Sequence, residues 1–270
     1  MMQKVLPKLT EAEVTLALKF AQGVLTEAGA IALGYFRQSI SVDNKLGEGE
    51  FDPVTCADRE VEAFLRQKLS RQFPEYGIIG EEGGVTTGSG DINWIIDPID
   101  GTKAFISGFP TWGMLLGLQQ GDEVLAGLMR QPATGELFIG SAAGGELQQQ
   151  GQSTPLRTRP TRQLNEAILY CTHESMFANQ ANLEAFRRIA AKARLQRFGG
   201  DCYAYCMLAL GQIDLVVEDT LQPYDIVPLI PIIEAAGGVI TNQHGKTPLD
   251  GGFVIAAATK ELHQQAMDLL

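Results

Sequence analysis

Four carboxylate residues of this 270-residue chain follow apolar strands or open helices: Glu81, Asp97, Asp100 and Asp225. Each of them alone would be explained equally well as a helix cap or a turn former. Brought to one site, four like charges repel one another, so such a cluster needs bound cations. Oxygen ligands without histidine or cysteine suit Mg²⁺, Mn²⁺ or Ca²⁺. Two such ions can ligate both the attacking water and the leaving oxygen of a phosphoryl transfer.

The residues from 94 to 103 indicate how two of these carboxylates are positioned. An apolar run predicts a buried strand that ends at Asp97, and Pro98 should force the chain to turn there. Gly101 lets the backbone approach a ligand closely, and Thr102 is a good cap for a helix that begins near residue 103. Two carboxylates would then lie above a positive helix N-terminus. A phosphate ester with a bound metal ion would fit this arrangement, because the carboxylates bind the cation and the helix N-terminus binds the phosphate.

The composition is that of an ordinary globular protein, with 45% hydrophobic residues and 30 glycines. A net charge of −11 disfavours nucleic-acid binding, because phosphate backbones need a basic surface; bound metal ions would still allow a small phosphorylated substrate. Residues 1–9 lack the apolar core of a secretion signal, and no run approaches the roughly 20 apolar residues of a membrane span. The four cysteines have no disulfide spacing. We therefore expect a cytoplasmic protein without membrane contact.

Helix and strand patterns alternate along the chain. Helices are predicted over residues 10–37, 182–192, 201–210 and 224–236, from residue 55 to about 69, and from 260 onwards. Strands are predicted at 77–80, 167–171, 195–198, 213–217, 239–240 and 253–257, with an antiparallel meander over 111–140 and a loop over 83–90. This alternation indicates a layered α/β fold. Residues 148–162 form the best boundary, between an N-terminal α+β lobe (1–150) and a C-terminal α/β lobe (151–270).

Three segments resemble the signatures of a known family: Gly80-Glu81-Glu82, Trp94 to Thr102, and Pro223-Tyr224-Asp225 with Glu234 to Gly238. They are similar to those of the inositol monophosphatase-like, Mg²⁺-dependent, lithium-sensitive phosphatases. The resemblance covers most of the chain and implies an alternating α-β-α-β-α sandwich of the sugar-phosphatase type. It also implies a homodimer that binds two or three Mg²⁺ ions per subunit, with Mn²⁺ as a substitute.

The same resemblance implies roles for individual residues. Glu81, Asp97, Asp100 and the backbone carbonyl of Ile99 should hold the metals, with Asp225 on the second ion. Thr102 and Asp58 should orient and deprotonate the metal-bound water, with Glu81 also near the reaction. The amides of Gly101 and Thr102 should receive the phosphate. Lys45 and Glu82 belong to a loop near a further, weaker metal site, although a solvated surface charge would explain Lys45 equally well.

The substrate is indicated by the second lobe. The segments 198–205, 214–218 and 222–225, together with Lys103-Ala104-Phe105, resemble the histidinol-phosphate phosphatase branch of the family, which acts in histidine biosynthesis. Histidinol phosphate carries a cationic amine and an imidazole, and Asp201 and Glu218 would complement these donors. Asp201 would serve equally well as a helix N-cap after Gly199-Gly200. Glu218, at a predicted strand end, is better explained by ligand contact.

Other functions remain open. The nearest alternative is the same chemistry on inositol 1-phosphate, another sugar phosphate or a 3′-phosphonucleotide. A regulatory binding protein that acts through RNA or polymerase is an alternative of another class, and the acidic balance argues against it. The three histidines are scattered and form no nucleophilic arrangement with serine or cysteine.

Overall fold

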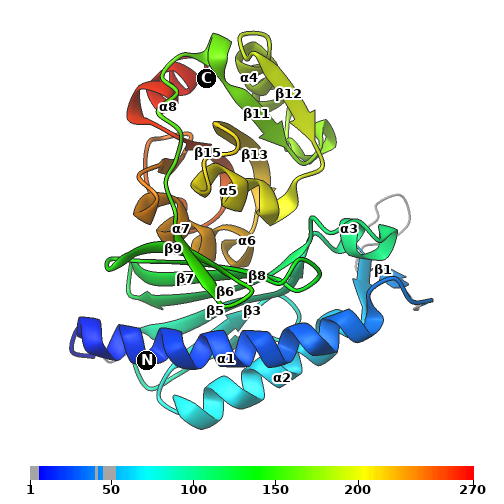
Figure 1. Ribbon diagram of the computed structural model, residues 1–270, viewed down its shortest axis with the longest axis vertical. Helices are drawn as coiled ribbons and strands as arrows, with labels where there is room; N and C mark the ends of the chain where they lie inside the picture. Colours follow the sequence, from blue (N-terminus) through cyan, green and yellow to red (C-terminus); the bar gives the residue numbers. More distant parts are fainter. Residues whose placement is uncertain (1–5, 40–41, 45–52) are drawn as a thin grey trace.

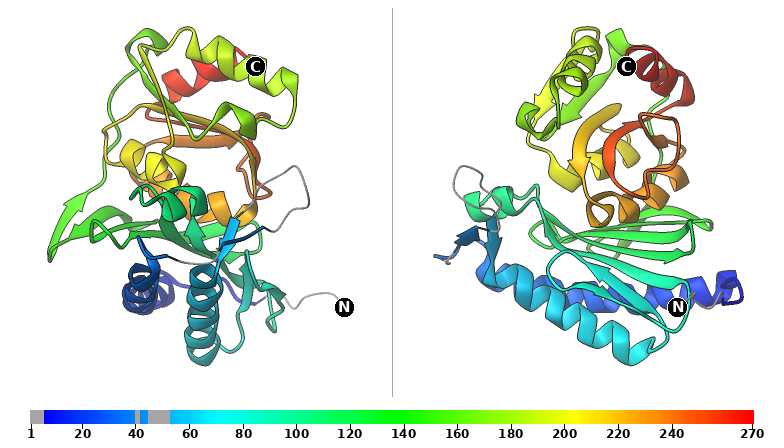
Figure 2. Two further views of the ribbon diagram at one scale, coloured as in Figure 1. Left: turned by 90° about the vertical axis from the view of Figure 1, so that its right-hand side faces the viewer. Right: turned by 180° about the vertical axis from the view of Figure 1, so that it is seen from behind.

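The computed structural model describes residues 6–39, 42–44 and 53–270. Helices cover one face of a large sheet, further helices lie between this sheet and a second one, and more helices close the far side (Figure 1). The views from the side and from behind show the same five layers (Figure 2). The predicted α-β-α-β-α sandwich is therefore confirmed.

The first helical layer consists of α1 (Glu11–Tyr35) and α2 (Cys56–Gln72). Both helices begin with a capping box, from Thr10 to Glu13 and from Thr55 to Asp58, as the sequence predicts for the second helix. By length and composition α1 could cross a membrane. Its face from Ala17 to Ala32, however, is buried in the core cluster that also contains α2 and the first sheet.

The first sheet has eight strands in the order β10-β9-β8-β7-β6-β5-β3-β4. Their bounds are β3 Gly77–Gly80, β4 Gly84–Thr86, β5 Ile92–Asp100, β6 Gly113–Gln120, β7 Glu123–Gln131, β8 Glu136–Ser141, β9 Gly144–Gln149 and β10 Gln152–Pro155. The strands β6 to β8 form the predicted antiparallel meander, β5, β9 and β10 extend it, and β3 runs parallel to β5. A small hairpin of β1 (Val42–Asn44) and β2 (Pro53–Thr55) precedes α2.

The end of β5 differs from the prediction. The strand continues through Pro98 to Asp100, with a register irregularity between Asp97 and Asp100. Proline is tolerated there because the ladder is already interrupted. The short helix α3 (Thr102–Ser107) begins at Thr102 itself, and its N-cap is Gly101 in the left-handed conformation, at φ = 79°. Thr102 is thus the first helical residue and not the cap.

The second sheet has five strands in the order β12-β11-β13-β15-β14. Their bounds are β11 Ile168–Cys171, β12 Leu195–Phe198, β13 Leu215–Leu221, β14 Val239–Asn242 and β15 Gly252–Ala257. The outer face carries α4 (Gln180–Ala190), α8 (Lys260–Met267) and the short 3₁₀ turns η1 (Leu164–Glu166) and η2 (Glu174–Met176). The inner face packs against α5 (Asp201–Ala209), α6 (Pro223–Ile226), η3 (Val227–Leu229) and α7 (Ile230–Ala235).

Three further boundaries that were predicted from the sequence were wrong. The helix predicted over 224–236 is divided into α6, η3 and α7, because Pro228 and Pro231 cannot donate helical hydrogen bonds. The strand predicted over 213–217 is β13, which continues to Leu221, so Glu218 lies within the strand and not at its end. The loop predicted over 83–90 contains the edge strand β4.

A row of glycines lets the middle helical layer lie directly on the first sheet. Gly117, Gly127 and Gly140 are register partners on β6, β7 and β8. A Cβ atom on Gly127 would collide with the backbone of Pro228 in η3, and one on Gly140 would collide with the backbone of Pro231 and Ile232. The missing side chains therefore permit the close approach that places α6, with Asp225, beside the end of β5.

Candidate metal centre and active site

Three of the predicted metal ligands come together from two elements that are far apart in the sequence. Asp97 and Asp100 lie at the irregular end of β5, and Asp225 is in the first turn of α6. One carboxylate oxygen from each of them lies within 4.8 Å of the other two. Residues up to 128 positions apart in the sequence thus form one acidic cluster, in which Asp97 is buried.

Burial and mutual repulsion raise the pKa values of these three carboxylates. Burial, followed by repulsion from Glu81, Asp100 and Asp225, raises the pKa of Asp97 well above its usual value. Burial and the charge of Asp225 raise the pKa of Asp100 in the same way. Burial raises the pKa of Asp225 to about 7, and Glu81 adds to this effect. The fourth predicted ligand, Glu81, therefore acts electrostatically on the same cluster.

The donor set fits a hard divalent cation. Among the described residues the cluster offers only carboxylate oxygens, which are the ligands that Mg²⁺ and Mn²⁺ prefer. Buried carboxylates without compensating positive charge are unfavourable, and a bound cation would remove both the repulsion and the rise in pKa. The Ile99 amide donates to Asp97 Oδ1 at 3.0 Å, which orients that carboxylate. The carbonyl of Ile99 accepts a hydrogen bond from Thr102 Oγ1 at 3.1 Å.

The predicted pair of Thr102 and Asp58 also meets beside the cluster. Thr102 Oγ1 lies 3.4 Å from Asp58 Oδ1, although α2 and α3 are separated by three strands in the sequence. The other oxygen of Asp58 accepts hydrogen bonds from the amide and hydroxyl of Thr55, as part of the capping box. Because Asp58 is 1% exposed and fixed by these bonds, it is a rigid acceptor for the threonine hydroxyl.

A second carboxylate of α2 orients the turn that carries Glu81. Glu62 lies one helical turn after Asp58 and is 1% exposed. It accepts hydrogen bonds from the amides of Glu82 and Gly83 at 2.7 and 2.8 Å, and it pairs with Arg66 at 2.6 Å. Sequence reasoning missed Glu62. Its spacing of four residues from Asp58 was the signal that could have identified it.

Asp201, a predicted substrate residue, lies over Gly101. A Cβ atom on Gly101 would come within 3.0 Å of the Asp201 side chain. The Asp201 carboxylate accepts a hydrogen bond from Thr111 Oγ1 at 3.1 Å, so it is held by the other lobe and does not cap its own helix. Asp201 has φ = 44°, a conformation that non-glycine residues rarely adopt. The N-cap alternative for Asp201 was therefore wrong, since Gly200 occupies that position.

Glu218 lies inside β13 and not at its end. It is 2% exposed, and both carboxylate oxygens already have partners in the chain. Oε1 accepts from the Thr172 amide at 2.7 Å, and Oε2 accepts from the Tyr205 hydroxyl at 3.0 Å. Burial raises the pKa of Glu218 to about 7. Tyr205 itself is buried in the core.

The remaining predicted residues are distributed as follows. Gly101 and Thr102 open α3, so their amides lie at a helix start, where amides have no intrahelical partners. The Glu82 side chain is half-buried in the turn after β3. Lys45 lies outside the described residues. Thr111 and Thr172 both form hydrogen bonds with Asp201. No sequence pattern would have identified either of them as part of the site.

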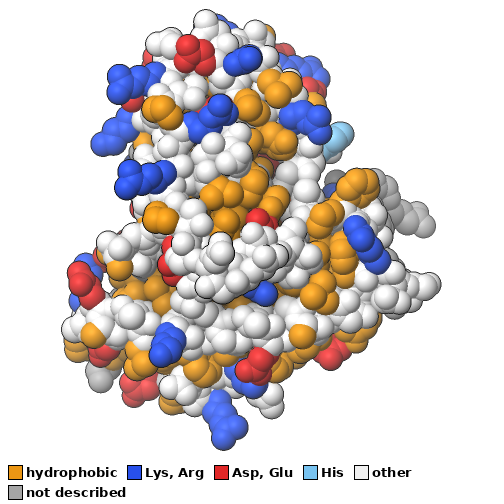
Figure 3. Space-filling model, in the orientation of Figure 1, with side chains coloured by type: hydrophobic (Ala, Val, Ile, Leu, Met, Phe, Trp, Pro, Cys, Tyr) orange, Lys and Arg blue, Asp and Glu red, His pale blue; other side chains and the backbone are white. Residues whose placement is uncertain are grey.

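On the face drawn in Figure 3, hydrophobic side chains gather over α5 and α3, the two helices that begin beside Asp201 and Gly101.

Comparison with known proteins shows the family to which the chain belongs. Residues 13–270 match the inositol monophosphatase family. The chain is 34% identical to the chloroplastic bifunctional phosphatase IMPL2 of Arabidopsis thaliana, over 97% of this chain and 77% of that protein. It is 31% identical to a histidinol-phosphatase of Chlorobaculum parvum, over 91% and 92%. A solved inositol monophosphatase from Zymomonas mobilis superposes with a TM-score of 0.82 at 33% identity, over 94% and 96%.

This chain therefore belongs to the inositol monophosphatase family. It is a phosphatase, a hydrolase of phosphoric monoesters, as the names of its relatives state for those proteins. Its acidic cluster is able to hold a metal ion.

Proposed function

We propose that this phosphatase hydrolyses histidinol phosphate to histidinol and inorganic phosphate, with Mg²⁺ in the acidic cluster and Mn²⁺ as a substitute. The observation that carries the proposal is the meeting of Asp97, Asp100 and Asp225 within 4.8 Å beside Thr102 and Asp58. We further propose a role in histidine biosynthesis, a cytoplasmic location and a homodimeric state.

The chain's own residues would contribute as follows. Glu81, Asp97, the Ile99 carbonyl, Asp100 and Asp225 would hold two or three ions. When bound, these ions supply an acidified water and charge stabilisation for the leaving oxygen. Thr102 would orient the attacking water through its hydroxyl and pass a proton toward Asp58. The amides of Gly101 and Thr102 would receive phosphate oxygens at the start of α3.

The choice of substrate rests on the side chain of Asp201. This carboxylate lies over Gly101 and is held by Thr111, so it is fixed where the alcohol part of a phosphate ester bound at α3 would extend. A cationic amine or an imidazole would complement it, whereas a neutral polyol would gain less.

Inositol 1-phosphate remains a second candidate, because the identities to the histidinol-phosphatase and to the inositol monophosphatase are nearly equal. The test is phosphate release from both esters, measured in parallel with Mg²⁺ and with EDTA. We expect a strong preference for histidinol phosphate that is lost in EDTA. A preference for inositol 1-phosphate would be consistent with the proposed metal site but would contradict histidinol phosphate as the substrate. Nucleic-acid binding without metal-dependent turnover of either ester would support a regulatory binding protein instead.

A further inference from the structure

The connection between α3 and β6 (residues 108–112) lies against the start of α3. A Cβ atom on Gly101 would come within 3.2 Å of the Trp112 backbone, so the N-cap of α3 rests on this residue. The Trp112 ring also packs edge-on against Phe105 of α3, with the ring centroids 4.9 Å apart. A displacement of Trp112 would therefore displace the start of α3 as well.

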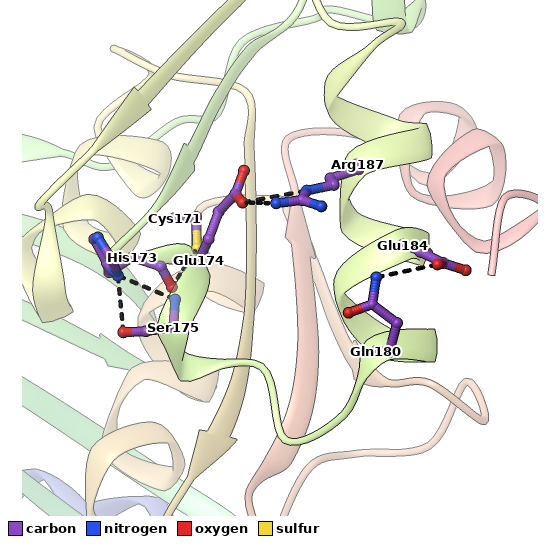
Figure 4. Close-up of polar contacts among 7 residues, drawn as sticks. All are labelled: Cys171, His173, Glu174, Ser175, Gln180, Glu184 and Arg187. Carbon is purple, nitrogen blue, oxygen red and sulfur yellow. Dashed lines mark hydrogen bonds and ion pairs between the residues drawn. The ribbon is translucent and has the colours of Figure 1, made fainter. Parts of the chain in front are cut away.

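The same connection holds Asp201 from one of two sides. On the side of the second sheet, the Asp201 amide donates to Thr172 Oγ1 at 3.1 Å. The segment after Thr172 is fixed in turn, since Figure 4 shows Glu174 of η2 reaching Arg187 on α4, and Arg187 Nε donates to Glu174 at 3.2 Å. On the other side, Thr111 of the connection donates to the Asp201 carboxylate at 3.1 Å. The first sheet thus acts on Asp201 through the connection.

A buried glutamine fixes the connection to the first sheet. Gln131, the last residue of β7, is 0% exposed. Its Nε2 donates to the carbonyl of Pro110 at 3.1 Å and to the carbonyl of Trp112. Its Oε1 accepts from the Ala133 amide. Because both amide hydrogens and the oxygen of the carboxamide have backbone partners, this side chain has a single favourable orientation.

The bonding of Gln131 is directed to the backbone of the connection. An apolar side chain of similar length would fill the same interior volume, so packing alone does not require a glutamine. Without the carboxamide, however, the carbonyls of Pro110 and Trp112 and the Ala133 amide would lose their partner in the interior, which is costly. The connection would then shift to find other partners.

We propose that Gln131 is a positioning residue for the start of α3, where the phosphate group is received. It acts through the backbone of Trp112 and through Thr111, and it does not touch the substrate. This inference rests on the proposed function in one respect, namely that the amides of Gly101 and Thr102 receive the phosphate. It does not depend on the alcohol that the ester carries.

The experiment measures the inhibition constant (Ki) of inorganic phosphate, and kcat/KM for histidinol phosphate and inositol 1-phosphate, in the Mg²⁺-loaded protein. Gln131→Met keeps the length of the side chain but loses its three hydrogen bonds. We expect Ki to rise about tenfold, and kcat/KM for both esters to fall by a common factor of about ten or more, because the esters share the phosphate group. Gln131→Asn keeps the carboxamide on a shorter side chain and should give an intermediate rise of Ki.

The matched control is Gln120→Met. Gln120 of β6 is also buried and also binds three backbone groups: it accepts from the Leu9 amide at 2.9 Å and donates to the carbonyls of Leu6 and Pro7 at 3.3 and 3.1 Å. It is the last residue of β6, at the end of the strand away from the connection. The control should lower the melting temperature as Gln131→Met does, but it should leave the Ki of phosphate unchanged.

Two results would overturn the proposal. One is a lower melting temperature in Gln131→Met with an unchanged Ki, which would make Gln131 a purely structural residue. The other is an equal rise of Ki in Gln131→Met and Gln120→Met, which would indicate a general loosening of the first sheet. If Gln131→Met does not fold, Gln131→Asn and Gln120→Asn decide in the same way. Failure of the proposed function is a separate observation, since it is read from the wild type alone, as missing metal-dependent phosphate release or as a preference for inositol 1-phosphate.

Discussion

Asp100 of β5 and Cys202 of α5 are joined by a hydrogen bond of 2.7 Å, from the Cys202 amide to Asp100 Oδ2. Cys202 is the second residue of α5, where helix amides lack intrahelical partners. A candidate metal ligand is therefore also a direct link between the first sheet and the middle helical layer. The metal site and the packing of α5 on this sheet depend on the same side chain.

Asp100→Asn separates these two roles. The amide oxygen can still accept from Cys202, but the lost charge weakens cation binding. We expect kcat/KM to fall by about 100-fold or more and the Mg²⁺-induced rise in melting temperature to shrink, while the melting temperature in EDTA stays at or above the wild-type value. Asp100→Ala, which also loses the link, should melt lower in EDTA. An unchanged Mg²⁺ response in Asp100→Asn would contradict the assignment.

Removal of metal should change the pH dependence of stability. The pKa values of Asp97, Asp100 and Asp225 are raised in the folded chain, that of Asp225 to about 7. Above pH 4 the folded state then holds more protons than the unfolded chain, so metal-free stability falls as pH rises from 5 through 7. With Mg²⁺ the ionised carboxylates are ligands, and stability should rise instead. Melting curves in EDTA and in MgCl₂ test this; equal slopes would argue against cation binding at the cluster.

Thr102→Val should damage turnover more than binding. The variant keeps the shape of the side chain but has no hydroxyl to contact Asp58. We expect kcat to fall by about 10²–10⁴-fold, whereas the Mg²⁺-induced shift in melting temperature persists. Thr102→Ser restores the hydroxyl and should recover most of the activity. Equal loss in both variants would point to packing and not to proton transfer.

Glu62→Gln tests whether the turn after β3 is positioned from α2. The substitution weakens the interactions with the Glu82 and Gly83 amides and the ion pair with Arg66. Because Glu81 would then be held less firmly, we expect about 10-fold weaker Mg²⁺ affinity by calorimetry. Glu60→Gln is the control, since Glu60 is an exposed residue of the same helix that binds Tyr35. Equal Mg²⁺ affinity in Glu62→Gln and Glu60→Gln would show that Glu62 does not support the metal site.

Gly127→Ala tests the close packing of the middle layer on the first sheet. The new methyl group would collide with the backbone of Pro228, which cannot rotate away as a side chain could. We expect a loss of about 1–3 kcal/mol in the free energy of unfolding. Gly117→Ala, where the nearest atom would lie at 3.3 Å, should cost clearly less. Denaturant titration of both variants measures the difference, and equal costs would contradict the packing argument.

Much of the fold and of the site followed from local patterns. The capping box at Thr55, the turns of the meander and the alternation of helices and strands were predicted correctly, because short-range hydrogen bonds and hydrophobic periodicity determine them. The errors arose where tertiary structure overrides local preference. Pro98 is tolerated inside β5 because the ladder is already irregular there, and β13 continues past Val217 because β15 pairs with it to Leu221.

The sequence by itself indicated which residues could bind a cation, namely isolated carboxylates at strand ends, whereas the expectation that Thr102 activates a water came from the family resemblance. Only the tertiary structure decided which of them meet. The distance between Asp97 and Asp225 depends on the packing of η3 against a glycine row, and the hydrogen bond from the Thr172 amide to Glu218 depends on the pairing of β11 with β13. Such contacts join residues far apart in the chain, and no local spacing encodes them.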